Sequence, residues 1–165
     1  MNVALRLADP THLDALLPLV RAYHAFEGIA QDERVRLAAL GALLASEGPG
    51  RVWLIVADGA LAGYLIVCFG YSVEFGGRDA FLDEFFIVEA QRGRGIGARA
   101  LALVQAETAA LGVRALHLEV ARDNARARRL YAAAGFEARS RYVLMSCPIK
   151  PWEEGEKGRR EDGGR

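Results

Sequence analysis

The chain has 165 residues, of which 52% are hydrophobic and 25% are charged. This length and composition are typical of one globular domain with its own core, and they leave little room for a second domain. Basic and acidic residues both number 21, so the formal net charge is zero. A neutral chain lacks the large basic surface with which proteins bind nucleic acids or anionic membranes without specificity.

Signals for metals, disulfides and membranes are weak. Cys68 and Cys147 have neither the number of a disulfide framework nor the spacing of metal ligands, and the three histidines fit no ligand spacing either, so no metal site is expected. Asp9, His12 and Asp14 interrupt the apolar residues of the N-terminal segment, unlike a signal peptide. No apolar run approaches the ~18 residues of a transmembrane helix. We therefore expect a cytoplasmic protein.

The first half of the chain predicts a strand, two helices and a hairpin. Residues 2–8 alternate between apolar and other side chains, which is typical of a strand. Two helices with apolar stripes follow, one ending near Gly28 and the other beginning at Asp32. The apolar runs 51–57 and 61–69 flank an Asp58-Gly59 turn, which predicts a β-hairpin. A glycine-rich connection over residues 70–79 then leads to the next strand.

The most informative stretch is residues 81–98, FLDEFFIVEAQRGRGIGA. Its apolar run 81–88 contains two acids and predicts a strand, and a loop with three glycines then opens directly into a helix rich in alanine and leucine. Glycines let backbone N–H groups approach an anion closely, and the first turn of a helix has unpaired N–H groups at the positive end of its dipole. The junction therefore predicts a phosphate-binding cradle.

The rest of the chain predicts a helix ending at Gly112, a strand over 113–120, a short helix over 125–134 and two short strands within 136–146. Residues 150–165 are too polar to bury a core, so we expect a disordered tail after a domain of residues 1–149. The sequence thus predicts a single α/β (α+β) domain with the order β-α-α-β-β-β-α-β-α-β-β.

Two motifs, in this order, carry a resemblance to a known family. The first is Arg92-x-x-Gly95-x-Gly97, and the second is Asn124-x-x-Ala127-x-x-Leu130-Tyr131-x-x-x-Gly135-Phe136. Together they resemble the GNAT superfamily of acetyl-CoA-dependent N-acetyltransferases, and the predicted element order fits that family over nearly the whole domain. The resemblance implies a mixed, mostly antiparallel central sheet flanked by helices.

The resemblance also implies acetyl-CoA as the cofactor. In the family, the glycine loop binds the pyrophosphate of coenzyme A through N–H groups, and the preceding strand pairs with the pantetheine arm. The residues that match are Phe86, Ile87, Val88, Arg92, Gly93, Arg94, Gly95, Ile96, Gly97 and Ala98, together with Asn124, Ala127 and Tyr131 of the second motif. Tyr131 is further expected to protonate the departing thiolate.

The chemistry of acetyl transfer asks for a base. An alkylamine with a pKa near ~10 is mostly protonated at neutral pH and must lose a proton before it attacks a thioester. Glu84 is the first candidate to accept that proton and Asp83 the second, with side chains on opposite faces of the strand. A backbone N–H freed by a bulge within Phe85–Val88 could bind the developing oxyanion. The predicted catalytic residues are therefore Tyr131, Glu84 and Asp83.

The acceptor is expected on the side lined by the first helix, the 70–79 connection and the central strand. The predicted substrate-binding residues are Tyr23, Phe26, Glu27, Glu74 and Glu119. Converging carboxylates would attract a cation, so we expect a small polar primary amine, preferably with a second cationic group. Peptide N-termini and protein lysines are the alternative acceptors. Resembling proteins are often dimers, so a homodimer is one of the expected states.

Two other classes of function fit parts of the sequence. The run from Gly93 to Ala98 matches the dinucleotide fingerprint G-x-G-x-x-[GA], with Glu119 as the ribose-binding acid. Four residues separate Val88 from Gly93, however, whereas that fingerprint turns directly after its strand. The other class is a non-catalytic module that binds acyl-CoA as a sensor. The combination of Glu84, Asn124 and Tyr131 argues against it.

Overall fold

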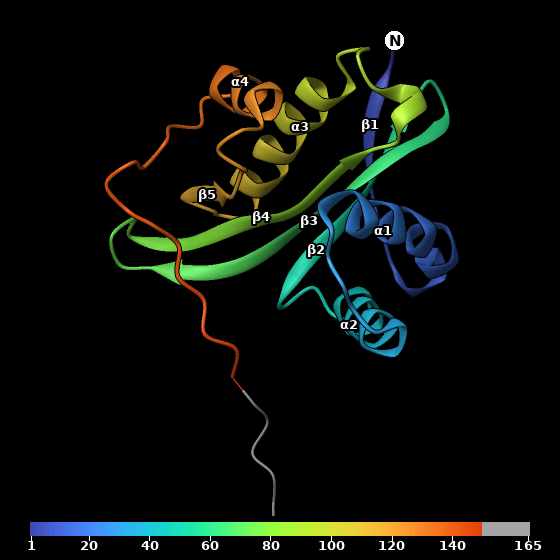
Figure 1. The fold of residues 1–165 in the computed structure, drawn as a ribbon, viewed down its shortest axis with the longest axis horizontal. Coiled ribbons are helices and arrows are strands. Elements are labelled where there is room, and N and C mark those ends of the chain that lie inside the picture. The colour runs from blue at the N-terminus through green and yellow to red at the C-terminus, as the bar shows by residue number, and fades with distance from the viewer. Residues whose placement is uncertain (150–165) are drawn as a thin grey trace, which may run out of the picture.

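A five-stranded sheet with helices on both faces forms residues 1–149, the part of the chain that the computed structural model describes (Figure 1). The strands are β1 (Val3–Leu7), β2 (Gly50–Ala57), β3 (Ala60–Ser72), β4 (Gly77–Ile87) and β5 (Ala115–Leu118). They lie side by side in chain order; β1 to β4 are antiparallel, and β5 is parallel to β4. The predicted mixed, mostly antiparallel sheet is therefore confirmed, whereas the expected tail of residues 150–165 lies outside the described residues.

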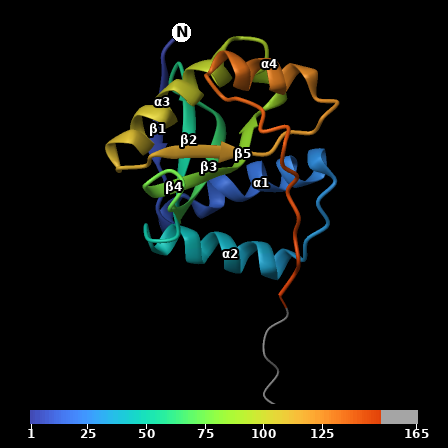
Figure 2. The same cartoon turned by 90° about the vertical axis from the view of Figure 1, so that its left-hand side faces the viewer.

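The helices divide into two pairs, one on each face of the sheet (Figures 1 and 2). They are α1 (Leu13–Glu27), α2 (Glu33–Ala45), α3 (Ile96–Ala110) and α4 (Ala125–Ala133). Short 3-10 turns precede α1 at Pro10–His12 and follow β4 at Glu89–Gln91. Helices α1 and α2 cover one face, and α3 and α4 cover the other.

Both faces of the central strands are buried, which explains why β2 and β3 are continuous apolar runs rather than alternating ones. Successive residues point to opposite faces, and each face has its own core. The core beneath α3 contains Trp53, Ile55, Leu65, Val67, Leu101 and Val104. The core beneath α1 and α2 contains Leu16, Val20, Leu40, Leu54, Tyr64 and Ile66. Burying one such aliphatic side chain contributes about 1.5–3 kcal/mol.

Two segments, a helix start and a hairpin turn, have the local structure that their sequences predict. The Asp32 carboxylate accepts hydrogen bonds from the backbone N–H groups of Arg34 (2.8 Å) and Val35 (3.4 Å), and so caps α2. Asp58 and Gly59 both have positive φ, 49° and 84°, as the tight hairpin turn between β2 and β3 requires.

The prediction of two short strands within residues 136–146 is wrong. The backbone N–H of Tyr142 donates to the carbonyl of Arg139 (3.0 Å), so a turn interrupts the chain where extended pairing was expected. The Arg139 guanidinium pairs with Glu74 (2.9 Å) and lies over the rings of Phe75 and Tyr142. These side-chain contacts, rather than a strand ladder, hold the segment, and the described residues 136–149 contain no strand.

The connection expected over residues 70–79 is also shorter than predicted. The pairing of β3 with β4 continues to Ser72 and Gly77, so only a tight turn separates the two strands. β4 in turn pairs with β5 only from Asp79 to Leu82. Beyond Leu82 the two strands part, which leaves the second half of β4 without a neighbour on that side. Glu74 lies at the opposite end of β4 from this opening.

Candidate active site

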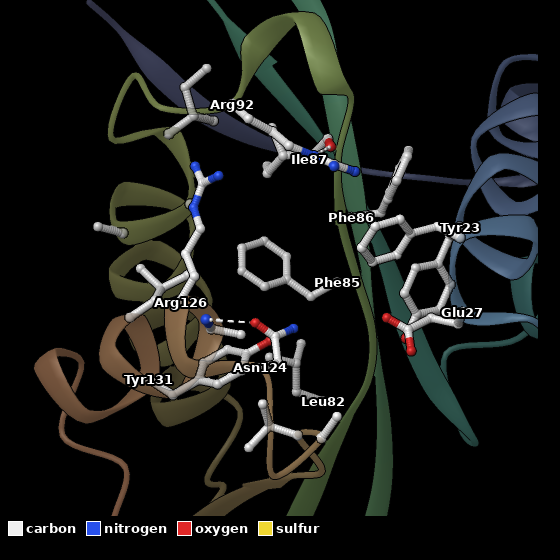
Figure 3. A pocket seen from close by; sticks show the side chains of 18 of the residues that line it. Tyr23, Glu27, Leu82, Phe85, Phe86, Ile87, Arg92, Asn124, Arg126 and Tyr131 are labelled. Atoms are coloured by element: carbon white, nitrogen blue, oxygen red, sulfur yellow. Dashed lines mark hydrogen bonds between the residues drawn. The ribbon is translucent and has the colours of Figure 1, made fainter.

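A pocket of about 440 Å³ opens where β4 and β5 stop pairing (Figure 3). The end of α1, the second half of β4, the glycine loop, the start of α3, the end of β5 and α4 line it. The sequence-predicted residues in its wall are Tyr23, Phe26, Glu27, Asp83, Phe86, Ile87, Arg92, Gly93, Gly95, Ile96, Gly97, Ala98, Glu119, Asn124, Ala127 and Tyr131. The fold thus brings residues separated by about two thirds of the chain into one cavity.

The edge of β4 presents backbone groups to this pocket. The N–H of Val88 donates to the carbonyl of Ala62 on β3 (2.9 Å). Because hydrogen-bonded and non-hydrogen-bonded residues alternate along an antiparallel pair, the N–H and C=O groups of Phe85 and Ile87 point away from β3. The Ile87 carbonyl accepts a hydrogen bond from Arg92 Nε (2.8 Å), as this orientation requires. An extended chain in the pocket could therefore pair with β4 as an added strand.

The start of α3 has the features of an anion site. Gly93 and Gly95 have positive φ, 81° and 77°, which lets the chain turn sharply into the helix. The first backbone hydrogen bond of the helix runs from Arg99 N–H to the Gly95 carbonyl (3.3 Å), so the N–H groups of residues 96–98 precede it. The first turn contains no acidic residue. Arg126 of α4 lies beside this helix start (Figure 3), and the region therefore favours a phosphate.

A bulge in β4 decides where its two acids point. Ile66 of β3 pairs with Glu84, and the next residue, Val67, pairs with Leu82, so Asp83 is an extra residue in the ladder. The bulge expected within Phe85–Val88 is thus at Asp83 instead. Asp83 lines the pocket. Partial burial, followed by the negative charges of Glu84 and Glu119, raises the pKa of the Asp83 carboxyl.

Glu84 points toward α1, where His24 lies, and is not among the residues that line the pocket. The Tyr64 hydroxyl donates to Glu84 Oε2 (2.5 Å), and His24 Nε2 lies 2.7 Å from Oε1. Both carboxylate oxygens therefore have partners. The bulge breaks the simple alternation of faces that was expected for the two acids, and the first candidate for the base is the one that does not line the pocket.

Two tyrosines face each other across the pocket, Tyr131 from α4 and Tyr23 from α1 (Figure 3). Burial, and secondly the charge of Glu27, raises the pKa of the Tyr131 phenol. The same two causes, in the same order, raise the pKa of Tyr23. Both hydroxyls therefore stay protonated at neutral pH, and each can donate a proton or a hydrogen bond into the pocket.

The remaining predicted residues have other surroundings. Asn124 is in the pocket wall, but its Oδ1 accepts from Ala127 N–H (3.0 Å) and so caps α4. Val88 packs in the core beneath α1. Arg94 bonds to Gln91 and Asp58, and Glu74 bonds to Arg139; neither Arg94 nor Glu74 lines the pocket.

Sequence reasoning missed several residues of the pocket wall. They are Leu82, Phe85, Gln91, Val120, Ala121, Arg126 and Leu130. Phe85 could have been found, because it lies two residues from Ile87 and therefore shares its face of the strand. Within residues 1–149, no three His, Cys, Asp or Glu residues are grouped to bind a metal, and no helix is long and apolar enough to cross a membrane.

The chain is similar to a known family and to solved structures. The acetyltransferase (GNAT) family matches residues 14–136. The uncharacterized N-acetyltransferase YycN of Bacillus subtilis is 37% identical over 69 residues, which cover 42% of this chain and 43% of YycN. The integron cassette protein HFX_CASS3, from the mobile metagenome of Cole Harbour Salt Marsh, has 33% identity and a TM-score of 0.77, with 89% of this chain and 91% of that one covered.

A likeness of fold alone extends to AAC(6')-Iy, whose structure contains the bisubstrate analogue CoA-S-monomethyl-acetylneamine. It has 20% identity and a TM-score of 0.75, with 90% of this chain and all of that chain covered (100%). The family match includes the glycine loop, β4 and the Asn124–Phe136 motif, so it covers the elements that build the pocket. The chain therefore belongs to the acetyltransferase (GNAT) family.

Proposed function

We propose that this protein transfers the acetyl group of acetyl-CoA to a primary amine of a small, cationic acceptor. The observation that carries the proposal is the composition of one pocket. An anion-binding helix start and an open strand edge lie in the same cavity as three carboxylates and the Tyr131 phenol. The helix start and the strand edge suit a long phosphorylated ligand. The carboxylates suit an amine, and the phenol suits a leaving thiolate.

The residues present fit coenzyme A. The N–H groups of Ile96, Gly97 and Ala98 would bind its pyrophosphate, with Arg126 as a nearby cation. The backbone groups of Phe85 and Ile87 that point away from β3 would pair with the amides of its pantetheine arm. When bound, acetyl-CoA supplies the acetyl group as a thioester.

The carboxylate that reaches the pocket from β4 is Asp83, so we assign it the role of base. Asp83 takes a proton from the ammonium form of the acceptor, directly or through a water molecule. The neutral amine then attacks the thioester carbonyl; the new C–N bond forms as the C–S bond breaks. Tyr131 gives its proton to the departing sulfur, and the proton that the nitrogen loses as the amide forms restores the Tyr131 phenol, directly or through water. The Phe85 N–H is suited to bind the negative charge on the carbonyl oxygen.

The acceptor side is acidic and aromatic. Glu27, Asp83 and Glu119 contribute negative charge, and Tyr23 and Phe26 contribute ring faces or edges. Carboxylates and aromatic rings both attract a cation. Among the structures with this fold, one is named an aminoglycoside acetyltransferase, and AAC(6')-Iy holds an acetylneamine analogue. Both names support a small amine as the acceptor. One is a ribosomal-protein-alanine N-acetyltransferase, so peptides belong in the test.

Thiol release from acetyl-CoA tests the proposal, with a panel of polyamines, aminoglycosides, amino acids and peptides as acceptors. Tyr131→Phe keeps the ring and its edge-on packing against Phe136, with the ring centroids 5.8 Å apart, but removes the hydroxyl proton. We expect kcat to fall by about 10²–10⁴-fold, with little change in the affinity for acetyl-CoA measured by calorimetry. A variant with the kcat of the wild-type protein would remove Tyr131 from the mechanism. Release only with peptides would refute the small-acceptor assignment.

A further inference from the structure

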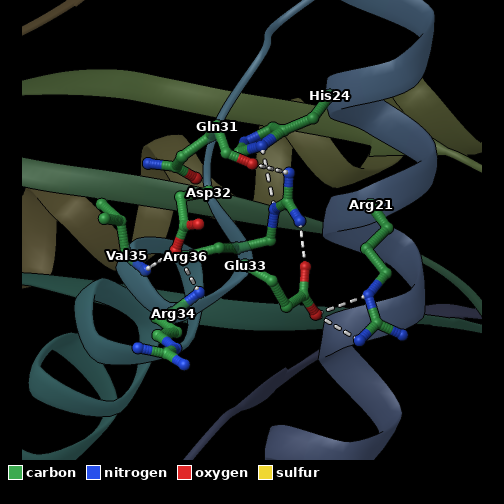
Figure 4. Close-up of polar contacts among 8 residues, drawn as sticks. All are labelled: Arg21, His24, Gln31, Asp32, Glu33, Arg34, Val35 and Arg36. Carbon is green, nitrogen blue, oxygen red and sulfur yellow. Dashed lines mark hydrogen bonds and ion pairs between the residues drawn. The ribbon is translucent and has the colours of Figure 1, made fainter.

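A chain of hydrogen bonds lies behind the pocket and joins four elements of the fold. Arg36 of α2 donates from Nε to His24 Nδ1 on α1 (3.3 Å), and His24 Nε2 meets Glu84 of β4 (2.7 Å). The Tyr64 hydroxyl of β3 donates to the other oxygen of Glu84 (2.5 Å). Tyr64 and His24 are 0% and 6% exposed. Figure 4 shows the α1–α2 part of this network, in which Glu33 also binds the Arg36 guanidinium.

The partners determine where the His24 proton is. A guanidinium can only donate, so Nδ1 must accept from Arg36 and has no proton of its own. The proton is therefore on Nε2, which donates it to the Glu84 carboxylate. Glu84 thus receives two hydrogen bonds from neutral donors, one from α1 and one from β3, and hydrogen bonds to a charged group are the stronger kind.

The anchored carboxylate is next to the bulge. Glu84 lies between Asp83, the extra residue of the bulge, and Phe85, whose backbone groups point into the pocket. Holding Glu84 against α1 therefore holds the backbone that orients Asp83. His24 is also flanked on α1 by Tyr23 and, one turn later, Glu27, which line the acceptor side.

We propose that His24 and Arg36 are positioning residues that act through Glu84. They set the orientation of Asp83 at the bulge and the distance between Asp83 and the acceptor-lining end of α1. This inference rests on the proposed function, because it assigns a role in acceptor recognition and proton transfer. It assigns no role in binding coenzyme A, since neither His24 nor Arg36 lines the pocket.

The test compares four variants in the thiol-release assay. His24→Leu removes the donor to Glu84 and keeps an apolar side chain in the site; His24→Gln keeps an N–H donor of similar reach. Tyr64→Phe removes only the other donor. Arg21→Gln is the matched control, because it breaks the other α1–α2 link, the exposed pair with Glu33, without touching Glu84.

We expect His24→Leu and Tyr64→Phe to lower kcat/KM for the acceptor by about 10- to 100-fold, the size of effect that a misplacement of roughly 1 Å produces. The KM for acetyl-CoA should stay within about twofold, as expected for residues outside the pocket. His24→Gln should recover most of the loss, and Arg21→Gln should match the wild-type protein. If His24→Leu does not fold, Arg36→Gln takes its place. It removes the bond to Nδ1, together with the contacts of Arg36 with Glu33 and Gln31, but leaves the His24 donor to Glu84, so it should show a smaller loss with the same selectivity for the acceptor.

Two outcomes would overturn the inference while leaving the proposed function intact. One is a His24→Leu protein, or an Arg36→Gln protein in its place, with wild-type kcat and KM for the acceptor. The other is an equal loss toward acceptor and acetyl-CoA, which indicates a general structural role. Absence of activity in the wild-type protein with every acceptor would instead refute the proposed function.

Discussion

Gly95, the residue that caps α3, offers a quantitative test of the anion cradle. It has φ 77° and ψ 4°, and a Cβ built on it would meet only the terminal methyl of Met1, at 4.0 Å. Gly95→Ala therefore adds a methyl group without a clash, and its cost comes from the left-handed backbone alone. For a residue with a Cβ atom, that conformation costs about 1–2 kcal/mol.

The strain in Gly95→Ala must appear in one of two measurements. If the substituted residue keeps the conformation of the glycine, the free energy of unfolding falls by that amount, and the Tm falls by about 2–8 °C in a chain of this length. If the cap instead relaxes to negative φ in the free protein, the N–H groups of residues 96–98 shift. The strain is then restored when acetyl-CoA binds, and its Kd rises by about 5- to 30-fold.

Gly41→Ala is the matched control. Gly41 lies inside α2 with no positive φ, and a Cβ there would have nothing within 4 Å. The same chemical change should therefore stabilise the protein by about 0.5–1 kcal/mol and leave the affinity for acetyl-CoA unchanged. Thermal unfolding by circular dichroism and calorimetric titration with acetyl-CoA give both quantities. A Gly95→Ala protein that loses neither stability nor affinity would show that the cradle does not depend on this cap.

Three further predictions follow from the site and its supports. Because the charge of Glu84 helps to raise the pKa of Asp83, Glu84→Gln should lower that pKa and move the acid limb of the kcat/KM profile to lower pH; an unmoved limb would argue against Asp83 as the base. Diamines should have a higher kcat/KM than matched monoamines, and the advantage should shrink in Glu27→Gln but persist in Glu74→Gln, whose carboxylate pairs with an arginine outside the pocket. Asp32→Ala removes the cap of α2 and should lower the free energy of unfolding by about 1 kcal/mol in denaturant titration, whereas an unchanged value would mean that the cap contributes nothing.

Much of the fold was predictable because its signals are local. A turn such as Asp58-Gly59 depends on which residues tolerate positive φ, and a cap such as Asp32 depends on a side chain that reaches N–H groups two and three residues away. The glycine loop is of the same kind, since its glycines and the helix start that they open into are adjacent in the chain. Apolar runs likewise predict strands buried on both faces without reference to any partner.

The direction of side chains on β4 was not predictable, because it depends on a partner strand. A bulge is a mismatch of register between two strands, and residues 81–88 alone contain no sign that Asp83 would be the unpaired one. The bulge makes Ile66 the partner of Glu84, which points toward α1, while Asp83 is the residue that lines the pocket. Which of the two candidate bases lines the pocket could therefore be decided only in the folded protein.

The sequence by itself determined the family of this protein, the strand-loop-helix that suits a phosphate and the tyrosine that we propose protonates sulfur, since each depends on a contiguous motif. The tertiary structure alone decided which acids converge on the pocket and which are bound to other side chains outside it. His24 meets Glu84 across 60 positions of sequence, and Glu74 is kept from the pocket by a hairpin that pairs to its last residues. Contacts of that range depend on how helices pack on the sheet, and packing is a property of the whole chain rather than of any segment.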